Sequence, residues 1–219
     1  MFGEEPLRGV DESQPYPSRY LAHYPETKAE AERMALAANS PDLATVALRP
    51  HLIWGPGDPH LIPRVVERAR AGQLRIVGDG RNLVDICYID NAAAAHLAAA
   101  DVLAPGADCA GRAYFISQGE PVRLWPWLND ILMKVGVIPV KRSISYSSAR
   151  IIGFTLELAY SAVRLDREPR MTRFLAAQLA MDHYFDISAA GRDFGYEPCV
   201  STGEGLTHLL EWLGTDRSA

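Results

Sequence analysis

Tyr24 and Lys28 are the two residues of this sequence whose types and spacing most directly suggest chemistry. They are four residues apart, so on a helix their side chains share one face. An ammonium group one turn away stabilises a phenolate, and the positive end of the helix dipole acts in the same direction. Such a tyrosine can give a proton to a carbonyl or take one from an alcohol. An ordinary surface contact between the two side chains is the alternative that spacing alone leaves open.

The residues around this pair predict a helix over 24–38. Pro25 suits the first helical turn, where its missing N–H costs nothing. Glu26, Glu30 and Glu32 crowd the early turns, which favours the helix dipole. Residues 1–23 are rich in Pro, Ser, Gly, Asp and Glu and show no clear period, so they predict a loop.

Strands and helices alternate along the rest of the chain, which predicts an α/β fold. Strands are predicted at 43–48, 75–77, 83–89 and 114–117, and helices at 61–72, 91–103, 124–135, 148–165, 171–182, after Ser188 and after Ser201. Asp90, Ser188 and Ser201 are the predicted N-caps of three of these helices.

Composition sets limits on the function. The chain has 219 residues, of which 48% are hydrophobic and 22% charged, so a sizeable core in one or two domains is expected. A net charge of −5 argues against a nucleic-acid partner. Three widely spaced cysteines and scattered histidines predict no disulfide and no metal site, and a reducing, cytoplasmic setting. No basic and apolar leader follows Met1, so no signal peptide is expected.

Three segments carry a resemblance to a known family. Residues 24–32 (YPETKAEAE) resemble the YxxxK helix of the extended short-chain dehydrogenases. Residues 48–58 (LRPHLIWGPGD) are similar to the family's strand and loop beside the nicotinamide. Residues 77–92 (VGDGRNLVDICYIDNA) resemble its GDG…VDDVA segment. Order and distances match the family pattern.

One branch of the family fits best. Nucleotide-sugar epimerases and dehydratases usually have an arginine before the aspartate of the third segment, where this chain has Val84. With residues 11–17 (DESQPYP), this detail resembles the 3β-hydroxysteroid dehydrogenase and sterol-4α-carboxylate 3-dehydrogenase branch. The resemblance implies the C-terminal part of a Rossmann-like parallel sheet. It implies an incomplete NAD(P)-binding domain at 1–118, with substrate-region segments at about 55–82, and a mainly helical substrate-binding region at 119–219.

The resemblance also implies roles for single residues. Tyr24 would be the general acid/base, and Lys28 its partner on the cofactor ribose. Pro50, His51 and Ile53 would line the nicotinamide site of NAD or NADP. The reaction would oxidise a small, hydrophobic, sterol-like secondary alcohol to a ketone.

The chain departs from the family pattern in one respect. A Rossmann half opens with a G-x-x-G-x-x-G segment, and none occurs in these residues. The chain is therefore expected to correspond to the C-terminal two-thirds of such an enzyme, and its activity alone is in question. A nucleotide-sugar epimerase or dehydratase, and a non-catalytic remnant or binding module, stay open as alternatives.

The helix predicted at 148–165 bears on partners. It is too short and too charged to be expected as a transmembrane span. It fits either a core or pocket helix or a surface that meets a sterol or lipid, so a peripheral membrane contact stays open, as does a homodimer.

Overall fold

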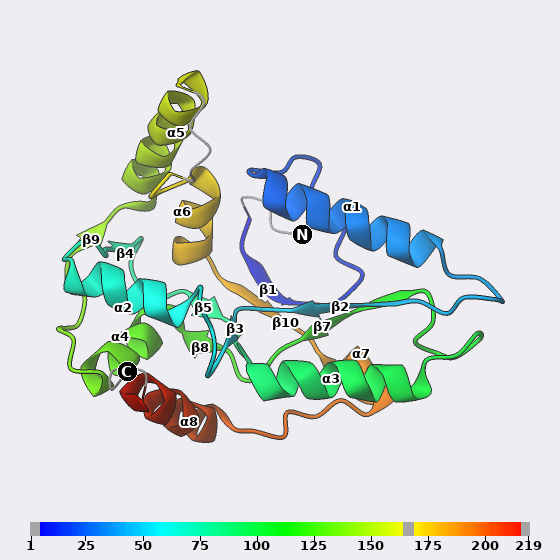
Figure 1. Ribbon diagram of the computed structural model, residues 1–219. Coiled ribbons are helices and arrows are strands. Elements are labelled where there is room, and N and C mark those ends of the chain that lie inside the picture. Colours follow the sequence, from blue (N-terminus) through cyan, green and yellow to red (C-terminus); the bar gives the residue numbers. More distant parts are fainter. Residues whose placement is uncertain (1–4, 164–168, 216–219) are drawn as a thin grey trace.

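The computed structural model describes residues 5–163 and 169–215. Residues 1–4, which begin the segment expected to hold no signal peptide, and residues 164 and 165 of the predicted helix lie outside these ranges. At the centre of Figure 1, the parallel strands β2 (Val46–Pro50) and β7 (Arg112–Ile116) lie between α1 (His23–Ala37) on one side and α3 (Ile89–Val102) with α7 (Ser188–Phe194) on the other. This layering confirms the predicted α/β class with parallel strands.

A second sheet has the strand order β1-β10-β5-β8. β10 (His183–Phe185) pairs in parallel with β1 (Leu7–Val10) and β5 (Leu83–Val84), and β8 (Val122–Arg123) closes the sheet in antiparallel orientation. The expectation that residues 1–23 are all loop is therefore wrong at β1. This short strand has no alternating pattern, and its buried Leu7 is held by distant aromatic residues, Phe115 and Phe185.

The strand predicted at 83–89 is divided in two. β5 ends at Val84, and β6 (Cys87–Tyr88) pairs in parallel with β3 (Ile53–Trp54) in another small sheet. Asp85 lies between the two strands, where its backbone N–H donates to the carbonyl of His183 and its carboxylate accepts from the N–H of Phe185. The local sequence predicts an extended run, but contacts with a strand about a hundred residues away break it.

The largest hydrophobic cluster lies away from the central pair β2–β7. It joins α2 (Ile62–Arg70), α4 (Leu124–Lys134) and α8 (Thr202–Thr215) around buried Trp54 and Trp125. Beside it, β4 (Ile76–Val77) pairs in parallel with β9 (Ser143–Ile144).

Strand pairing crosses the expected division of the chain at residue 118. β9 and β10 belong to 119–219, but they pair with strands of 1–118. Part of the segment 55–82 packs against helices of 119–219, as an interleaved substrate region would. The division itself stays a prediction.

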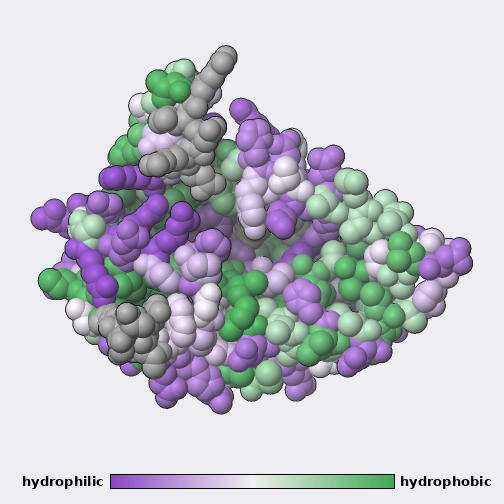
Figure 2. All heavy atoms as spheres, in the orientation of Figure 1, coloured by the Kyte–Doolittle hydropathy of each residue, from purple (hydrophilic) through white to green (hydrophobic). Residues whose placement is uncertain are grey.

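α5 (Tyr146–Ala162) packs against α6 (Arg173–Ala180) and extends from the body of the molecule (Figure 1). Only Ala149 and Gly153 of α5 are buried, whereas Phe154 is 52% and Leu158 61% exposed. Hydrophobic side chains therefore lie on the surface of α5 (Figure 2), and the core-helix alternative does not describe it. Across residues 5–163 and 169–215, each helix is either too short or too polar to traverse a bilayer.

Two of the three predicted caps are wrong. α3 begins at Ile89 with Tyr88 as its N-cap, so Asp90 lies inside the first turn. α7 begins at Ser188 itself, after Ile187. The third is confirmed, because the Ser201 hydroxyl accepts from the N–H of Glu204 at 3.2 Å.

Candidate active site

α1 carries Tyr24 and Lys28 on one exposed side. Pro25 and Ala29 are the buried residues of the helix, and they fix which stripe packs against the protein. Tyr24 and Lys28 precede these two by one position each, so they lie together at the flank of the contact, and Tyr24 is 65% exposed. The predicted pair is thus on a single helix face at the start of α1.

Glu32 lies one helical turn beyond Lys28 and anchors α1 to β2. Its carboxylate accepts two hydrogen bonds from the Arg49 guanidinium on β2, at 2.6 and 2.7 Å, and each side chain is only 12% exposed. The hydroxyl of Tyr16 donates to the same carboxylate. Burial disfavours ionisation of Glu32, but the hydrogen bonds from Arg49 and Tyr16 outweigh it and lower the pKa of Glu32. This contact fixes the rotation of α1 relative to β2.

The first turn of α1 and the carboxyl end of β2 lie at the same side of the central layer (Figure 1). α1 and β2 are consecutive elements that pack together and run in opposite directions, so Tyr24 and Pro50 belong to neighbouring ends. In open α/β sheets, ligands bind at the carboxyl ends of the parallel strands.

The three residues predicted to line the nicotinamide site lie at the carboxyl end of β2 and just after it: Pro50, His51 and Ile53. Pro50 is the last residue of β2, His51 is buried, and Ile53 in β3 is 39% exposed. Leu52 between them has a φ of 44°, and among the described non-glycine residues no other has a positive φ. A branched residue held in this region is strained, and such strain gathers at functional sites.

His51 does more than the sequence predicted. Its Nε2 lies 2.7 Å from Nδ1 of His183, and Nε2 of His183 lies 2.8 Å from the carbonyl oxygen of Gln178. A carbonyl only accepts, so Nε2 of His183 donates to it, and Nδ1 accepts from His51. Burial lowers the pKa of both imidazoles, and repulsion from His183 adds to the effect at His51. Two neutral histidines therefore brace the end of β2 against β10.

Asp85, which lies between β5 and β6, is fully buried beside β10. Its carboxylate accepts from the backbone N–H of Phe185 at 2.9 Å, and burial raises its pKa to about 6. The sequence placed this residue at a strand end and gave no sign of its contact with β10.

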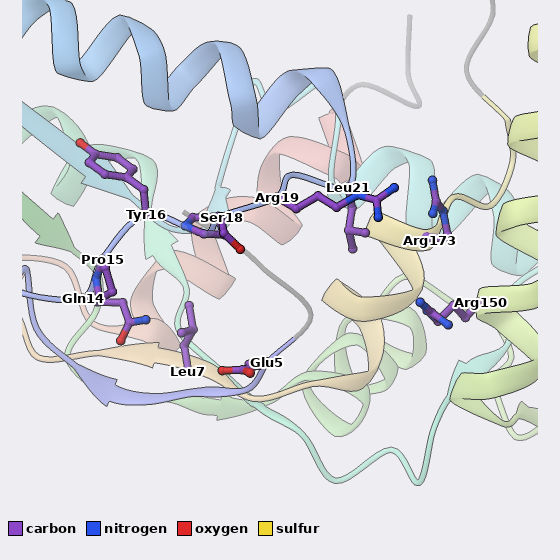
Figure 3. Close-up of a pocket in the computed structure, with 11 residues that line it drawn as sticks. Glu5, Leu7, Gln14, Pro15, Tyr16, Ser18, Arg19, Leu21, Arg150 and Arg173 are labelled. Atoms are coloured by element: carbon purple, nitrogen blue, oxygen red, sulfur yellow. The ribbon is translucent and has the colours of Figure 1, made fainter.

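A cavity of about 400 Å³ opens beside the start of α1. Its wall includes Leu21, two residues before the helix, and three arginines: Arg19, Arg150 of α5 and Arg173 of α6. In Figure 3 the arginines lie on one side of the cavity, and Tyr16, Gln14 and Leu7 lie on the other. Sequence reasoning missed this site, since its residues come from three separate segments.

No group of three His, Cys, Asp or Glu side chains within 5–163 and 169–215 is arranged to hold a metal ion.

Comparison with known proteins shows the family of the chain. Residues 1–146 match the model of the 3-beta hydroxysteroid dehydrogenase/isomerase family. The chain is 54% identical over 201 residues to the 2-alkyl-3-oxoalkanoate reductase of Stenotrophomonas maltophilia, a match that covers 92% of this chain and 61% of that protein. It is 34% identical to the mouse sterol-4-alpha-carboxylate 3-dehydrogenase (Mus musculus), a match that covers 94% of this chain and 59% of that protein.

The solved structure of the UDP-glucuronic acid 4-epimerase from Bacillus cereus, in complex with NAD, has a similar fold. The TM-score is 0.64 at 20% identity, with 96% of this chain and 57% of that chain covered. The chain thus spans about 60% of the length of the two curated relatives named above. On the family model and these identities, the chain belongs to the 3-beta hydroxysteroid dehydrogenase/isomerase family.

Proposed function

We propose that the chain is part of an NAD(P)-dependent oxidoreductase that interconverts a secondary alcohol and a ketone. One observation carries the proposal: Tyr24 and Lys28 share the exposed face of α1 whose rotation Glu32 and Arg49 fix against β2. This face begins where β2 ends, and a cavity opens beside it.

Tyr24 exchanges the proton of the reacting oxygen in this proposal. In reduction its hydroxyl donates a proton to the carbonyl oxygen of the substrate, and in oxidation its phenolate form accepts the alcohol proton. Lys28 stabilises the phenolate that remains and binds ribose hydroxyls of the cofactor. Pro50 and the backbone from His51 to Ile53 border the nicotinamide, and the strained Leu52 fixes the path of that loop.

The residues present fit one half of a dinucleotide. Lys28 and the strained turn after β2 suit the nicotinamide ribose, whereas the 219 residues hold no glycine-rich segment for the diphosphate. Bound NAD or NADP would supply the exchange of hydride with the substrate carbon. Several similar folds were solved with NAD, and the mouse relative is named a dehydrogenase, which supports this cofactor class.

The relatives' names suggest which substrate the site takes. Proteins 54% and 50% identical to this chain are named 2-alkyl-3-oxoalkanoate reductases, and the sterol-4-alpha-carboxylate dehydrogenase is 34% identical. We therefore place a 2-alkyl-3-oxo acid ahead of a sterol-like alcohol as the substrate. In both, a carboxylate stands on the carbon next to the one that is oxidised or reduced.

A nucleotide-sugar reaction is the less favoured activity. Val84 stands where the epimerase pattern has its diphosphate arginine, and this side chain is fully buried in the largest hydrophobic cluster. It has neither the charge nor the access to hold a diphosphate. A cytoplasmic location, a homodimer and a peripheral membrane contact stay predictions.

The test uses the chain with NADH or NADPH and a 2-alkyl-3-oxo acid. Loss of reduced cofactor is followed by absorbance, and cofactor binding by fluorescence. Tyr24→Phe should lower kcat at least about a hundredfold, because it removes the proton donor, and should leave cofactor affinity nearly unchanged. Equal turnover in that variant would refute the role of Tyr24. Absence of saturable cofactor binding would favour the non-catalytic remnant.

A further inference from the structure

The described residues that line the cavity beside α1 include more positive than negative side chains. Arg19, Arg150 and Arg173 contribute to its wall, and among these described lining residues Glu5 alone is acidic. A cavity of this kind attracts an anion. Resting on the function proposed above, we propose that this cavity binds the carboxylate of the 3-oxo or 3-hydroxy acid, and that Arg19 determines specificity for acids over their uncharged analogues.

The three arginines differ in what they already contact. Arg173 donates through Nε to Glu157 at 2.7 Å, and its backbone N–H donates to the same carboxylate at 2.7 Å. Arg150 also has an interaction of its own. Arg19 is exposed at the cavity, and among the described residues no carboxylate lies within ion-pair distance of it. Arg19 is therefore the arginine whose charge is most available to a ligand.

Arginine suits this task for a geometric reason. Its planar guanidinium matches a carboxylate with two parallel hydrogen bonds, which a lysine cannot reproduce. In Figure 3 the side chain of Arg19 extends in the direction of Arg173, and both residues line the same cavity.

The position of the cavity agrees with the chemistry of the substrate. In a 3-oxo acid the carboxyl carbon is two bonds from the carbon that is reduced, so an anion site must lie close to the proton donor. Arg19 and Leu21 line the cavity, and Tyr24 follows Leu21 by three residues at the start of α1. Tyr24 is not itself a lining residue of the cavity, so the proposal requires that a carboxylate held by Arg19 leave the ketone outside the lining, at Tyr24.

Apolar surface borders the same arginines and provides for the alkyl groups. The Arg173 guanidinium stacks over the ring of Phe154 at 5.4 Å. Arg150, Phe154 and Leu158 follow one another at four-residue spacing along α5, so they lie on one helix face. Phe154 and Leu158 are both more than half exposed, and this stripe leads away from the cavity.

The experiment compares an acid with its methyl ester, so that only the charge differs. 2-Methyl-3-hydroxyoctanoate and its methyl ester are titrated into the 219-residue chain, and the heat of binding is measured at fixed ionic strength. We expect the acid to bind at least tenfold more tightly than the ester. Arg19→Met should remove that difference, Arg19→Lys should restore part of it, and Arg64→Met, an exposed arginine of α2, should change nothing.

Equal affinities for acid and ester in the unaltered chain would overturn the proposal. So would an Arg19→Met variant that still prefers the acid, or that binds both compounds more weakly by the same factor. Circular dichroism checks that Arg19→Met folds. If it does not, the acid–ester difference is measured in the unaltered chain and in Arg150→Met, where the proposal expects the preference for the acid to be reduced. Competition between the acid and NAD that Arg19→Met abolishes would assign the cavity to a cofactor phosphate and overturn the proposal as well.

This measurement needs neither cofactor nor turnover, so it separates the two proposals. Acid binding that depends on Arg19, in a chain without reductase activity, would uphold the subsite and refute the function. Turnover that is equal for acid and ester substrates would uphold the oxidoreductase and refute the subsite.

Discussion

The Arg49 guanidinium on β2 holds the Glu32 carboxylate on α1 through two hydrogen bonds of 2.6 and 2.7 Å. Both side chains are about nine-tenths buried, and Glu32 stands one helical turn beyond Lys28, which stands one turn beyond Tyr24. A bidentate contact restricts rotation of a helix more than a single hydrogen bond does. The pair therefore ties the orientation of the proposed catalytic face to the strand whose end borders the cofactor.

Arg49→Met should lower the free energy of unfolding by about 3 kcal/mol, because the buried Glu32 carboxylate loses its counter-ion. Urea unfolding followed by circular dichroism measures the change. Lys134→Met is the matched control, since Lys134 and Asp130 form an exposed pair at 3.9 Å. That control should change stability by less than about 1 kcal/mol. Similar effects of the two substitutions would show that the Glu32–Arg49 contact does not anchor α1.

Local signals in the sequence predicted α1 almost to the residue. Pro25 and the acidic residues after it act within one helical turn, so a single segment carries the information. The strands β1 and β10 could not be predicted in this way. Each has three or four residues, and they pair with each other although more than 170 positions separate them in the sequence.

The residues of the candidate site also differ in whether local sequence could predict them. Tyr24 and Lys28 are neighbours on one helix, so spacing suggested the pair and the family resemblance gave it a predicted catalytic role. Arg19, Arg150 and Arg173 come from a loop and two helices, and only the packing of α5 and α6 near the start of α1 brings them to one cavity. No local pattern marks an arginine as part of such a group.

Asp85→Asn should change how stability depends on pH. Burial raises the pKa of folded Asp85 from 3.8 to about 6, so between these values the folded state holds a proton that the unfolded state releases. Stability from this group therefore falls as pH rises through that window, by about 3 kcal/mol in total. The asparagine keeps an acceptor for the Phe185 N–H and cannot ionise.

The free energy of unfolding of the Asp85→Asn variant, relative to the unaltered chain, should thus rise between pH 4 and pH 7. Urea unfolding at several pH values measures this difference. Asp42→Asn replaces an exposed carboxylate and is the control, for which no such rise is expected. A pH-independent difference for Asp85→Asn would mean that Asp85 is ionised in the folded protein throughout this range.

The His51–His183 contact predicts the opposite pH trend. Burial lowers the pKa of both folded imidazoles below the ordinary value of 6.5, so on acidification the unfolded state takes up protons first. Stability from this pair is present above pH 6.5 and is lost as pH falls below it. The Asp85→Asn background removes the opposing trend of Asp85. In that background the thermal midpoint of unfolding should decrease as the pH is lowered from 7 to 5.

His51→Gln in that background should flatten the fall, since glutamine can donate to His183 without titrating. His60→Gln, at an exposed histidine, should leave it unchanged. An equally steep fall in both variants would assign the acid sensitivity to other groups.

Gly153→Ala tests whether the approach of α5 to α6 shapes the arginine cavity. A Cβ at position 153 would lie 2.6 Å from the backbone carbonyl carbon of Thr172 and 2.7 Å from the backbone nitrogen of Arg173. Backbone atoms cannot yield as a side-chain end can, so α5 must move away, at a cost of about 1–3 kcal/mol in stability. Since Arg150 is on α5 and Arg173 begins α6, the same shift should separate these two guanidinium groups and weaken binding of the hydroxy acid several-fold.

Gly203→Ala in α8 is the matched control, because its Cβ would meet nothing within 4 Å, and it should be neutral or slightly stabilising. Loss of stability in Gly153→Ala with unchanged acid affinity would show that the spacing of α5 and α6 supports the fold but not the anion site.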